Sequence, residues 1–433
     1  MYNGLIDFLK NKKICILGYG KEGISTYNYL VKNGITNIKV HDLVEKDVDG
    51  VYGDTYLDNL DKYDVIIKGP GVVLKNIDIS SFENKITSQL ELVLEYGPKN
   101  IVGVTGSKGK STTTSLIYQM LKEQGRDVYL LGNVGIPIFD YLDSFKDDSY
   151  LVIEMAALQL EFVHKSPHIS VITNLYPEHL DFFRNKDNYY KAKLNILKYQ
   201  SDNDYGIYCS SNEELEKYIS DGNYKSRLFK CNFIDGDICI KDNYIYINGN
   251  KVYNTNDERK IIGNHNLMNI MLALKVADIL GLDMNKCSDT INNFEPLEHR
   301  MQKVGEFDGI IYYDDAIATI PAATINCIDA LGSVDTLITG GKDRGIEYDS
   351  LVTYLNNSNV NNVICMPESG YRFIDKITKK VYKVETLEEA VNIAKKVTKK
   401  GSICLLSPSA PSYNQFKNYI EKGNKFQSLV KGE

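Results

Sequence analysis

Short apolar runs alternate with longer amphipathic stretches along almost the whole chain. The runs have the length of buried strands, and glycine, asparagine or proline often follows them. The stretches between them, such as residues 23–34, repeat apolar positions with the period of a helix. This alternation predicts an α/β fold with mostly parallel sheets. The predicted strands lie in residues 13–20, 37–42, 63–71, 101–104, 150–155, 169–175, 309–315, 336–341, 362–367 and 402–408.

The pattern divides the chain into three sections, and we expect one domain in each. The expected domains are residues 1–96, 97–296 and 297–433. A chain of 433 residues agrees with two or three domains. Residues 205–256 are predicted to form antiparallel strands, with a tight turn at Asn248 and Gly249. Ligands of such folds bind at the carboxyl ends of the strands, so we expect the site there.

The composition excludes several classes of protein. A net charge of −7 argues against a nucleic-acid-binding surface. No apolar run approaches membrane-spanning length, and the first residues, MYNGLIDFLKNKK, lack the pattern of a signal peptide. The eight cysteines are scattered without a Cys-x-x-Cys pair, and several lie in strand-like runs. They indicate buried thiols in a reducing cytoplasm.

The most specific motif is IVGVTGSKGKSTTTS at residues 101–115. An apolar run breaks into a glycine-rich turn, Lys110 and Ser111 follow, and a helical pattern continues over residues 112–123. Backbone N–H groups and the helix dipole of such a turn bind phosphate, while the lysine reaches the outer phosphates and the serine suits Mg²⁺. The strict pattern would place glycine at Val104, so a purely structural turn is the alternative. The predicted ATP-binding residues here are Gly106, Ser107, Lys108, Gly109, Lys110, Ser111 and Thr112.

Another glycine turn, at residues 18–23, has the form G-x-G-x-x-G between a strand and a helix. Asp42 ends the next predicted strand, which suggests a dinucleotide or diphosphate on the turn and a ribose at Asp42. A structural tight turn is the alternative. A further turn at residues 69–71 could line the same crevice. The predicted residues of this site are Gly18, Gly20, Gly23, Asp42 and Gly71.

Ionisable side chains mark the second section. Glu154 ends a predicted strand, and in a phosphate-loop fold a carboxylate there ligates Mg²⁺ or orients an attacking group. His179 follows the next strand beside Glu178, where a site and a structural histidine are equal alternatives. Lys193, taken alone, is interpreted as a surface lysine on a helix, because an ammonium cannot ligate a cation.

The remaining candidates are amides, glycines and hydroxyls. Asn266 and Asn269 share one face of a predicted helix and could read a nucleobase edge, with helix capping nearby as the alternative. Residues 340–345, GGKDRG, form a glycine turn with a cation that suits a carboxylate or a phosphate. Ser412 follows the last strand, and residues 413–419 are predicted to place aromatic core positions on an amphipathic helix.

Taken in order, these motifs resemble those of the Mur ligases. The motifs are GVTGSKGKST, GNVG, VIEMAALQLE, TNLYPEHLDFF, YKAKLNI, GNHNLMN, LEHR, GGKDRG and LLSPSAPSYNQFKNYIEKGNKF. They cover essentially the whole chain, and the last is most similar to the branch that adds glutamate to UDP-N-acetylmuramoyl-L-alanine in peptidoglycan synthesis. The resemblance implies a Rossmann-like UDP-binding domain, a central ATPase domain and a Rossmann-like C-terminal domain that closes over the site. It also implies that the turn at residues 18–23 faces a UDP-sugar and not NAD.

The resemblance implies ATP-dependent amide ligation. The alanyl carboxylate attacks the γ-phosphate to give an acyl phosphate, and the amine of glutamate then displaces phosphate. Lys110 would stabilise the transferring phosphoryl group, Ser111 and Glu154 would ligate one Mg²⁺, and His179 and Lys193, the latter as a carbamate, would serve a second. The other implied contacts are Asn133 and His179 with the UDP-sugar, Asn266, Asn269, Arg300 and Asp315 with ATP, and Thr319, Arg344, Ser412 and Tyr419 with glutamate. We expect ATP and two Mg²⁺ ions as cofactors, small-molecule substrates, no nucleic-acid or membrane partner, and a cytoplasmic monomer.

Some positions depart from the pattern of the D-glutamate-adding branch. The run DAIATI at residues 315–320 stands where Asp-Ser-Lys-Ala-Thr-Asn is common, so that Ile317 replaces the lysine. Residues 156–158, AAL, replace Ser-Ser-Phe, and residues 407–412, SPSAPS, replace Ser-Pro-Ala-Cys-Ala-Ser. The loss of Lys and Asn near the expected amino-acid pocket leaves L-glutamate open as the alternative to D-glutamate.

Two other classes of function are open to the sequence. An NAD-dependent oxidoreductase built on residues 18–23 leaves Lys110 and Ser111 without a role. A nucleotide-gated binding protein derived from the ligase fold has no need of Glu154, His179 or Lys193. The sequence therefore favours an active ligase.

Overall fold

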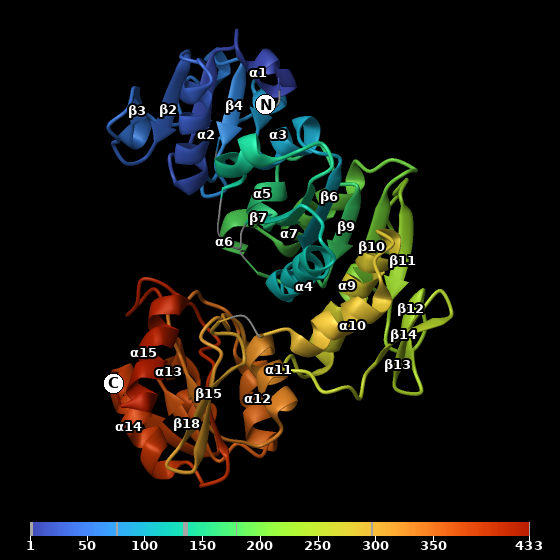
Figure 1. Cartoon of the computed structure of the whole chain (residues 1–433). Helices are drawn as coiled ribbons and strands as arrows, with labels where there is room; N and C mark the ends of the chain where they lie inside the picture. The colour runs from blue at the N-terminus through green and yellow to red at the C-terminus, as the bar shows by residue number, and fades with distance from the viewer. Residues whose placement is uncertain (1–2, 75–76, 133–136, 179, 296–297, 433) are drawn as a thin grey trace. The chain divides into compact units, whose positions relative to one another are not determined.

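The computed structural model describes residues 3–74, 77–132, 137–178, 180–295 and 298–432. Its strands form three sheets, and parallel pairing dominates, so the α/β prediction is confirmed (Figure 1). The chain divides into two compact units. The first comprises Met1–Asp257 and Met268–Asn292, and the second comprises Glu258–Leu267 and Asn293–Glu433.

The first sheet has five parallel strands in the order β3-β2-β1-β4-β5. Strands β1 and β4 are buried along their whole length, as their continuous apolar runs predict. The order of the strands reverses between these two, and a crevice for ligands lies at such a switch point. The elements are α1 (Asn3–Leu9), β1 (Ile14–Leu17), α2 (Lys21–Lys32), β2 (Ile38–Asp42), β3 (Gly50–Tyr52), β4 (Val65–Lys68), β5 (Ile86–Thr87) and α3 (Gln89–Tyr96).

The second sheet has nine strands in the order β14-β13-β12-β11-β10-β9-β6-β8-β7. Only the pairs β12–β13 and β13–β14 are antiparallel among the described pairs. The elements are β6 (Asn100–Thr105), α4 (Lys110–Glu123), β7 (Val128–Gly132), β8 (Tyr150–Glu154), α5 (Ala157–Leu160), β9 (Ile169–Ile172), α6 (Leu180–Phe183), α7 (Lys186–Lys198), β10 (Tyr205–Cys209), α8 (Glu213–Ser220), β11 (Arg227–Cys231), β12 (Ile238–Lys241), β13 (Tyr244–Ile247), β14 (Asn250–Asn254), α9 (Asn264–Ile279) and α10 (Met284–Asn293).

The prediction of antiparallel strands over residues 205–256 is wrong for β10 and β11, which are parallel to their neighbours. Helices α7 and α8 precede and follow β10, and such crossovers permit parallel pairing. The tight turn is confirmed, because Asn248 and Gly249 join β13 to β14 with φ angles of 51° and 82°.

The third sheet has the order β15-β16-β20-β17-β18-β19, and only its edge strand β15 is antiparallel. Alternate residues of β20 belong to different buried clusters: Cys404 and Leu406 to one, Ile403 and Leu405 to the other. The two clusters therefore lie on opposite faces of this sheet. The elements are β15 (Gln302–Phe307), β16 (Ile310–Asp314), α11 (Pro321–Leu331), β17 (Val334–Thr339), α12 (Asp349–Asn357), β18 (Asn362–Cys365), α13 (Ser369–Phe373), β19 (Lys380–Lys383), α14 (Leu387–Val397), β20 (Ile403–Leu406) and α15 (Tyr419–Lys431).

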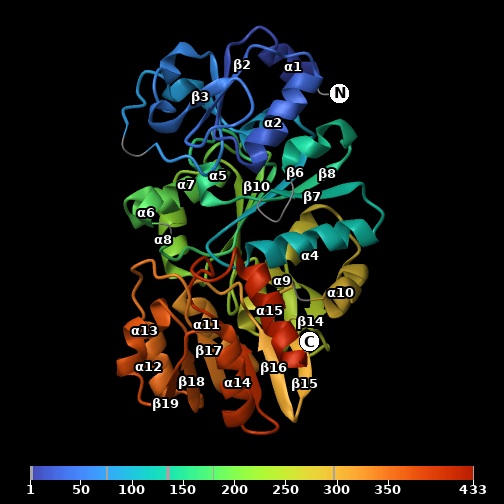
Figure 2. The same cartoon turned by 90° about the vertical axis from the view of Figure 1, so that its left-hand side faces the viewer.

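Helix α15 packs beside α14 and against β16, as Figure 2 shows. It begins at Tyr419, because the Asn418 side chain accepts a hydrogen bond from the backbone N–H of Glu421 and caps the helix. The prediction of an amphipathic helix is therefore wrong for residues 413–418, and Tyr413 is 71% exposed, whereas Phe416 packs against the buried cluster that contains Cys404 and Leu406. Within the described parts of the chain, no helix has both the length and the apolar character needed to cross a membrane.

Candidate active site

The phosphate-type loop joins β6 to α4 and is shaped by two glycines in the left-handed region. Gly106 has φ 144° and Gly109 has φ 85°. A Cβ atom would lie 1.9 Å from Thr173 Oγ1 at Gly106 and 2.4 Å from Asn269 Oδ1 at Gly109. Both positions therefore require glycine for backbone angle and for space. Gly109 precedes Lys110, where α4 begins, two residues before the predicted start.

Thr173 and Asn174, which follow β9, hold this loop through hydrogen bonds. The Lys108 N–H donates to Asn174 Oδ1 at 2.8 Å, and its carbonyl accepts from Thr173 Oγ1 at 2.5 Å and from Asn174 Nδ2 at 3.0 Å. The Ser107 N–H donates to the Asn174 carbonyl at 3.0 Å. The sequence analysis did not single out Thr173 or Asn174. Their place at the end of a strand that pairs with β6 was the available signal.

Two lysine side chains meet at one carbonyl of the loop. Lys110 Nζ donates to the carbonyls of Gly106 and Ser107 at 2.9 and 3.0 Å, and Lys193 Nζ donates to the Gly106 carbonyl at 2.7 Å. Lys193 is 1% exposed, so its interpretation as a surface lysine is wrong. Burial, and then the nearby charge of Lys110, lower the pKa of Lys193 well below its ordinary value.

Two carboxylates lie close to these amines. Glu154 ends β8, pairs in register with Val104 of β6 and is 1% exposed. The charges of Glu178 and Glu154 act on Lys193 and raise its pKa, against the larger effect of burial. Glu178 also pairs with Lys108 at 2.9 Å. The structure thus brings Lys110, Glu154 and Lys193 together around the loop, while the predicted site residues His179 and Asn133 lie outside the described residues.

The two glycine turns of the first sheet lie together at its switch point. A Cβ atom on Gly23 would lie 2.1 Å from the Gly18 carbonyl oxygen, so the turn and the start of α2 are in direct contact. A Cβ atom on Gly18 would lie 2.7 Å from Val72, which follows the second turn. Asp42 accepts hydrogen bonds from the N–H groups of Tyr19 and Val44 at 2.7 and 2.8 Å. This carboxylate ties the first turn to the loop after β2.

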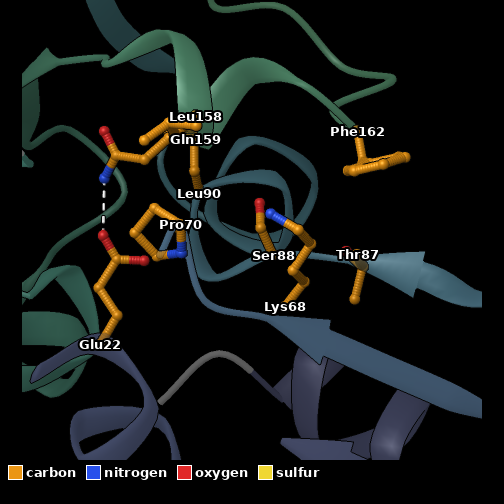
Figure 3. Close-up of a pocket in the computed structure, with 9 residues that line it drawn as sticks. All are labelled: Glu22, Lys68, Pro70, Thr87, Ser88, Leu90, Leu158, Gln159 and Phe162. Carbon is orange, nitrogen blue, oxygen red and sulfur yellow. Dashed lines mark hydrogen bonds between the residues drawn. The ribbon is translucent and has the colours of Figure 1, made fainter. Parts of the chain in front are cut away.

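A small pocket of about 10 Å³ lies beside these turns, and Figure 3 shows the side chains that line it. Gln159 of α5 donates to Glu22 Oε1 at 2.6 Å and caps its own helix by accepting from the Ala156 N–H at 2.9 Å. Lys68, 5% exposed at the end of β4, lies 3.7 Å from Glu161. These contacts connect the glycine turns to the segment after Glu154, and no motif in the sequence predicts them.

In the second unit, the predicted ATP-binding residue Asp315 has a strongly shifted pKa. It accepts from Ser407 Oγ at 2.9 Å and from the Met301 N–H at 3.2 Å. Burial raises its pKa to about 7, although its hydrogen bonds and the charge of Arg300 act in the opposite direction. The predicted nucleotide residues Arg300 and Asp315 are therefore neighbours.

The residues predicted to bind glutamate also come from neighbouring segments of this unit. The Gly340 N–H donates to the Pro408 carbonyl at 2.9 Å, and the Lys342 N–H donates to the Pro411 carbonyl at 2.7 Å. These bonds join the turn that carries Arg344 to the segment that ends at Ser412, which is 3% exposed. Tyr419, 36% exposed, begins α15, and Thr319 precedes α11.

Comparison with known proteins places these features in one family. Residues 104–277 match the model of the Mur ligase middle domain, and residues 299–410 match that of the Mur ligase glutamate ligase domain. A UDP-N-acetylmuramoylalanine--D-glutamate ligase of Clostridium botulinum (strain Hall) is 33% identical over 98% of this chain and 97% of its own length. The enzyme of the same name from Clostridium tetani is 31% identical over 99% of both.

The chain belongs to the Mur ligase family. Two solved Mur ligases of Thermotoga maritima share its fold at 20% sequence identity. MurF in complex with ADP has a TM-score of 0.64 and covers 97% of this chain and 95% of that one. UDP-N-acetylmuramate-alanine ligase MurC has a TM-score of 0.62 and covers 98% and 100%.

The donor set of this Mur ligase fits Mg²⁺ in part. Ser111 and Glu154 offer hard oxygen ligands at the loop, which is the chemistry that Mg²⁺ prefers. In the part of the chain that the structure describes, no three His, Cys, Asp or Glu side chains stand together as a metal site. Lys193 could contribute an oxygen only after conversion to a carbamate. Two residues predicted to bind ATP are also buried: Asn269 accepts from Thr113 Oγ1 at 3.2 Å, and Asn266 donates to the Ile262 carbonyl at 2.9 Å.

Proposed function

We propose that this Mur ligase adds D-glutamate to UDP-N-acetylmuramoyl-L-alanine and converts ATP to ADP and phosphate. The convergence of Lys110, Lys193 and Glu154 around the loop at residues 106–111 carries the proposal, because phosphoryl transfer needs cations and positioned oxygens at one place. Relatives that carry the name of this enzyme match the chain over nearly its whole length, which supports the substrate assignment.

The loop residues act first. The backbone N–H groups at the start of α4 hold the phosphates, and Lys110 exchanges its bonds to the Gly106 and Ser107 carbonyls for the transferring phosphoryl group. The substrate carboxylate displaces ADP from the γ-phosphorus to form an acyl phosphate. The amine of glutamate then attacks the acyl carbon and releases phosphate, and the ammonium loses its proton as the amide forms. Bound Mg²⁺ supplies charge neutralisation at the phosphates, with Ser111 and Glu154 as its proposed ligands.

Lys193 is the proposed site of carbamylation. A neutral amine adds to CO₂ and releases one proton, which leaves an anionic oxygen donor in place of a cation. The burial of Lys193 and its position against Gly106 support this proposal, because a carbamate on this side chain would lie beside the loop. We propose that the carbamate and His179 serve a second Mg²⁺ ion.

The remaining assignments are carried over from the family motifs. We assign the UDP-sugar to the turns at residues 18–23 and 69–71 with Asn133 and His179, and ATP also to Asn266, Asn269, Arg300 and Asp315. We assign glutamate to Thr319, Arg344, Ser412 and Tyr419. Domains of residues 1–96, 97–296 and 297–433, two Mg²⁺ ions and a cytoplasmic monomer complete the proposal.

Phosphate release across an amino-acid panel tests this function. Purified protein is given ATP, Mg²⁺ and UDP-N-acetylmuramoyl-L-alanine with D-glutamate, L-glutamate, D-aspartate or L-lysine. We expect the highest turnover with D-glutamate. Equal or higher turnover with L-glutamate would contradict the assignment of D-glutamate as the substrate. L-Glutamate is the alternative because Ile317 stands where a lysine is common. No phosphate release with any of them would contradict the ligase assignment.

A further inference from the structure

His299 is held from several sides inside the second unit. Its Nδ1 lies 2.7 Å from Asp314 Oδ2, and both side chains are buried. The backbone N–H of His299 donates to Gln302 Oε1 at 2.9 Å, and the backbone carbonyl of His299 accepts from the Ile317 N–H at 3.3 Å. These contacts fix the ring of His299 to β16, and its backbone to β15 and to the loop that follows β16.

The backbone on each side of Arg300 is strained. His299 has φ 59° and Met301 has φ 45°, which are left-handed values that side chains with a Cβ atom rarely adopt. Such residues keep these angles only where surrounding contacts impose them. The Met301 N–H is held in turn by Asp315 Oδ1 at 3.2 Å. The position of Arg300 therefore depends on the contacts of its two neighbours.

Helix α15 supplies one of those contacts through a glycine. A Cβ atom on Gly423 would lie 2.1 Å from His299 Nδ1, so the imidazole rests directly on the helix backbone. One turn later, Gln427 Nε2 donates to Asp314 Oδ2 at 2.9 Å and to Gln302 Oε1 at 3.0 Å. The helix thus touches His299 itself and the two side chains that hold it, Asp314 and Gln302.

The same helix also contacts the glycine turn at residues 340–345, which carries Arg344. Lys422, next to Gly423, is 1% exposed, and its Nζ donates to the Gly340 carbonyl at 2.8 Å. Tyr419, one turn earlier, has its ring 6.2 Å from the imidazole of His299. Helix α15 therefore carries Tyr419, which is assigned to glutamate, and contacts His299 and Asp314, the chain neighbours of the two residues assigned to the nucleotide.

We propose that His299 is a positioning residue that couples the position of α15 to the positions of Arg300 and Asp315. The position of this helix against His299 therefore sets the affinity for the nucleotide. The inference rests on the proposed function for the assignment of Arg300 and Asp315 to ATP. No residue of α15 itself is assigned to the nucleotide. A change on the helix that disturbs His299 should nevertheless weaken nucleotide binding.

The test is the Kd of Mg²⁺-ADP, measured by calorimetry on the full chain. Gly423→Ala should raise the Kd about tenfold, because the new methyl group must displace the imidazole. The matched control is Gly432→Ala at the end of the same helix, where φ is 80° and nothing lies within 4 Å of the added atom. It should lower the melting temperature but leave the Kd within twofold of the wild type.

Further variants separate positioning from folding. His299→Asn keeps an N–H donor at the place of Nδ1 and tolerates a positive φ, so it should retain most of the affinity that His299→Ala loses. Adding Gly423→Ala to His299→Ala should cost little more, since no ring remains to be displaced. If Gly423→Ala does not fold, Gln427→Met removes the bonds to Asp314 and Gln302 without altering the helix backbone, and should raise the Kd in the same direction.

Two results would overturn the proposal: an unchanged Kd in the folded Gly423→Ala and Gln427→Met variants, or effects of Gly423→Ala and His299→Ala that multiply. The ADP titration contains neither UDP-sugar nor glutamate. A wild type that binds ADP but forms no amide would therefore contradict the proposed function alone.

Discussion

Gly109, the residue before α4, should not tolerate even a methyl group. Its φ of 85° costs a residue with a Cβ atom about 1–2 kcal/mol. The added atom would also lie 2.4 Å from Asn269 Oδ1, and real Cβ atoms essentially never come closer than 3.0 Å to another heavy atom. The gap must open by at least the difference, 0.6 Å, which moves the loop, α9 or the Asn269 side chain, whose oxygen accepts a hydrogen bond from Thr113. Such overpacking costs about 1–3 kcal/mol more.

Gly125 provides a matched control at the other end of the same helix. It has a similar φ of 75°, but nothing lies within 4 Å of an added Cβ atom. Gly125→Ala should therefore cost only the backbone strain, about 1–2 kcal/mol, against about 2–5 kcal/mol for Gly109→Ala. Urea unfolding of both variants measures the difference.

The two variants should differ more in activity than in stability. Displacement of the phosphate loop by about half an ångström or more should lower kcat/KM for ATP about 10–100-fold in Gly109→Ala, because misplacement of about 1 Å can cost 10²-fold. Gly125→Ala should keep the wild-type value. In the unfolding assay, Asn269→Ala should restore part of the free energy of unfolding lost in Gly109→Ala, because it removes the Oδ1 atom that the new Cβ atom would approach. Equal stability losses in the two glycine variants, with kcat/KM for ATP preserved in both, would refute this reasoning.

Three further outcomes are expected. Lys110→Ala should lower kcat by about 10²–10³-fold or more, whereas Lys122→Ala, on an exposed face of the same helix, should keep it; equal kinetics would contradict the loop assignment. Lys193→Ala should lose activity to a similar extent, and removal of CO₂ should reversibly inactivate the wild type, with recovery on adding bicarbonate; indifference to bicarbonate would argue against the carbamate. Because burial raises the pKa of Asp315 to about 7 from about 3.9 in an unfolded chain, the folded state binds more protons between these values, so stability should fall as pH rises from 4 to 7. Asp315→Asn should flatten that slope in urea unfolding, and an unchanged slope would show that other groups cause it.

The periodicity of apolar residues predicted the elements well where burial is continuous. Strands β1, β4, β8 and β9 lie within their predicted runs, and β6 exceeds its run by one residue at each end, because strands buried on both faces are mostly apolar. Strand direction could not be predicted in this way, and β10 shows why: its run reads the same in a parallel and an antiparallel pair. The helix expected over residues 413–419 failed for residues 413–418 for a local reason, since Asn418 caps a helix that begins only at Tyr419.

The site was predictable where chemistry follows a strand, and not where distant segments meet. Lys110 and Glu154 were identified from their places after β6 and at the end of β8. The burial of Lys193 depends on its contact with Gly106, which no spacing within α7 encodes. The hydrogen bonds of Asn174 to the loop and the contact of Gly423 with the His299 ring likewise join residues far apart in sequence, and only the fold brings them together.

The most direct test of the central claim is the product itself. Incubation with ATP, Mg²⁺, UDP-N-acetylmuramoyl-L-alanine and ¹⁵N-labelled D-glutamate, followed by mass spectrometry, should show a nucleotide that has gained one labelled glutamyl residue. One ADP and one phosphate should appear for each amide formed. Hydrolysis of ATP without this product, or a product that forms only with L-glutamate, would contradict the account.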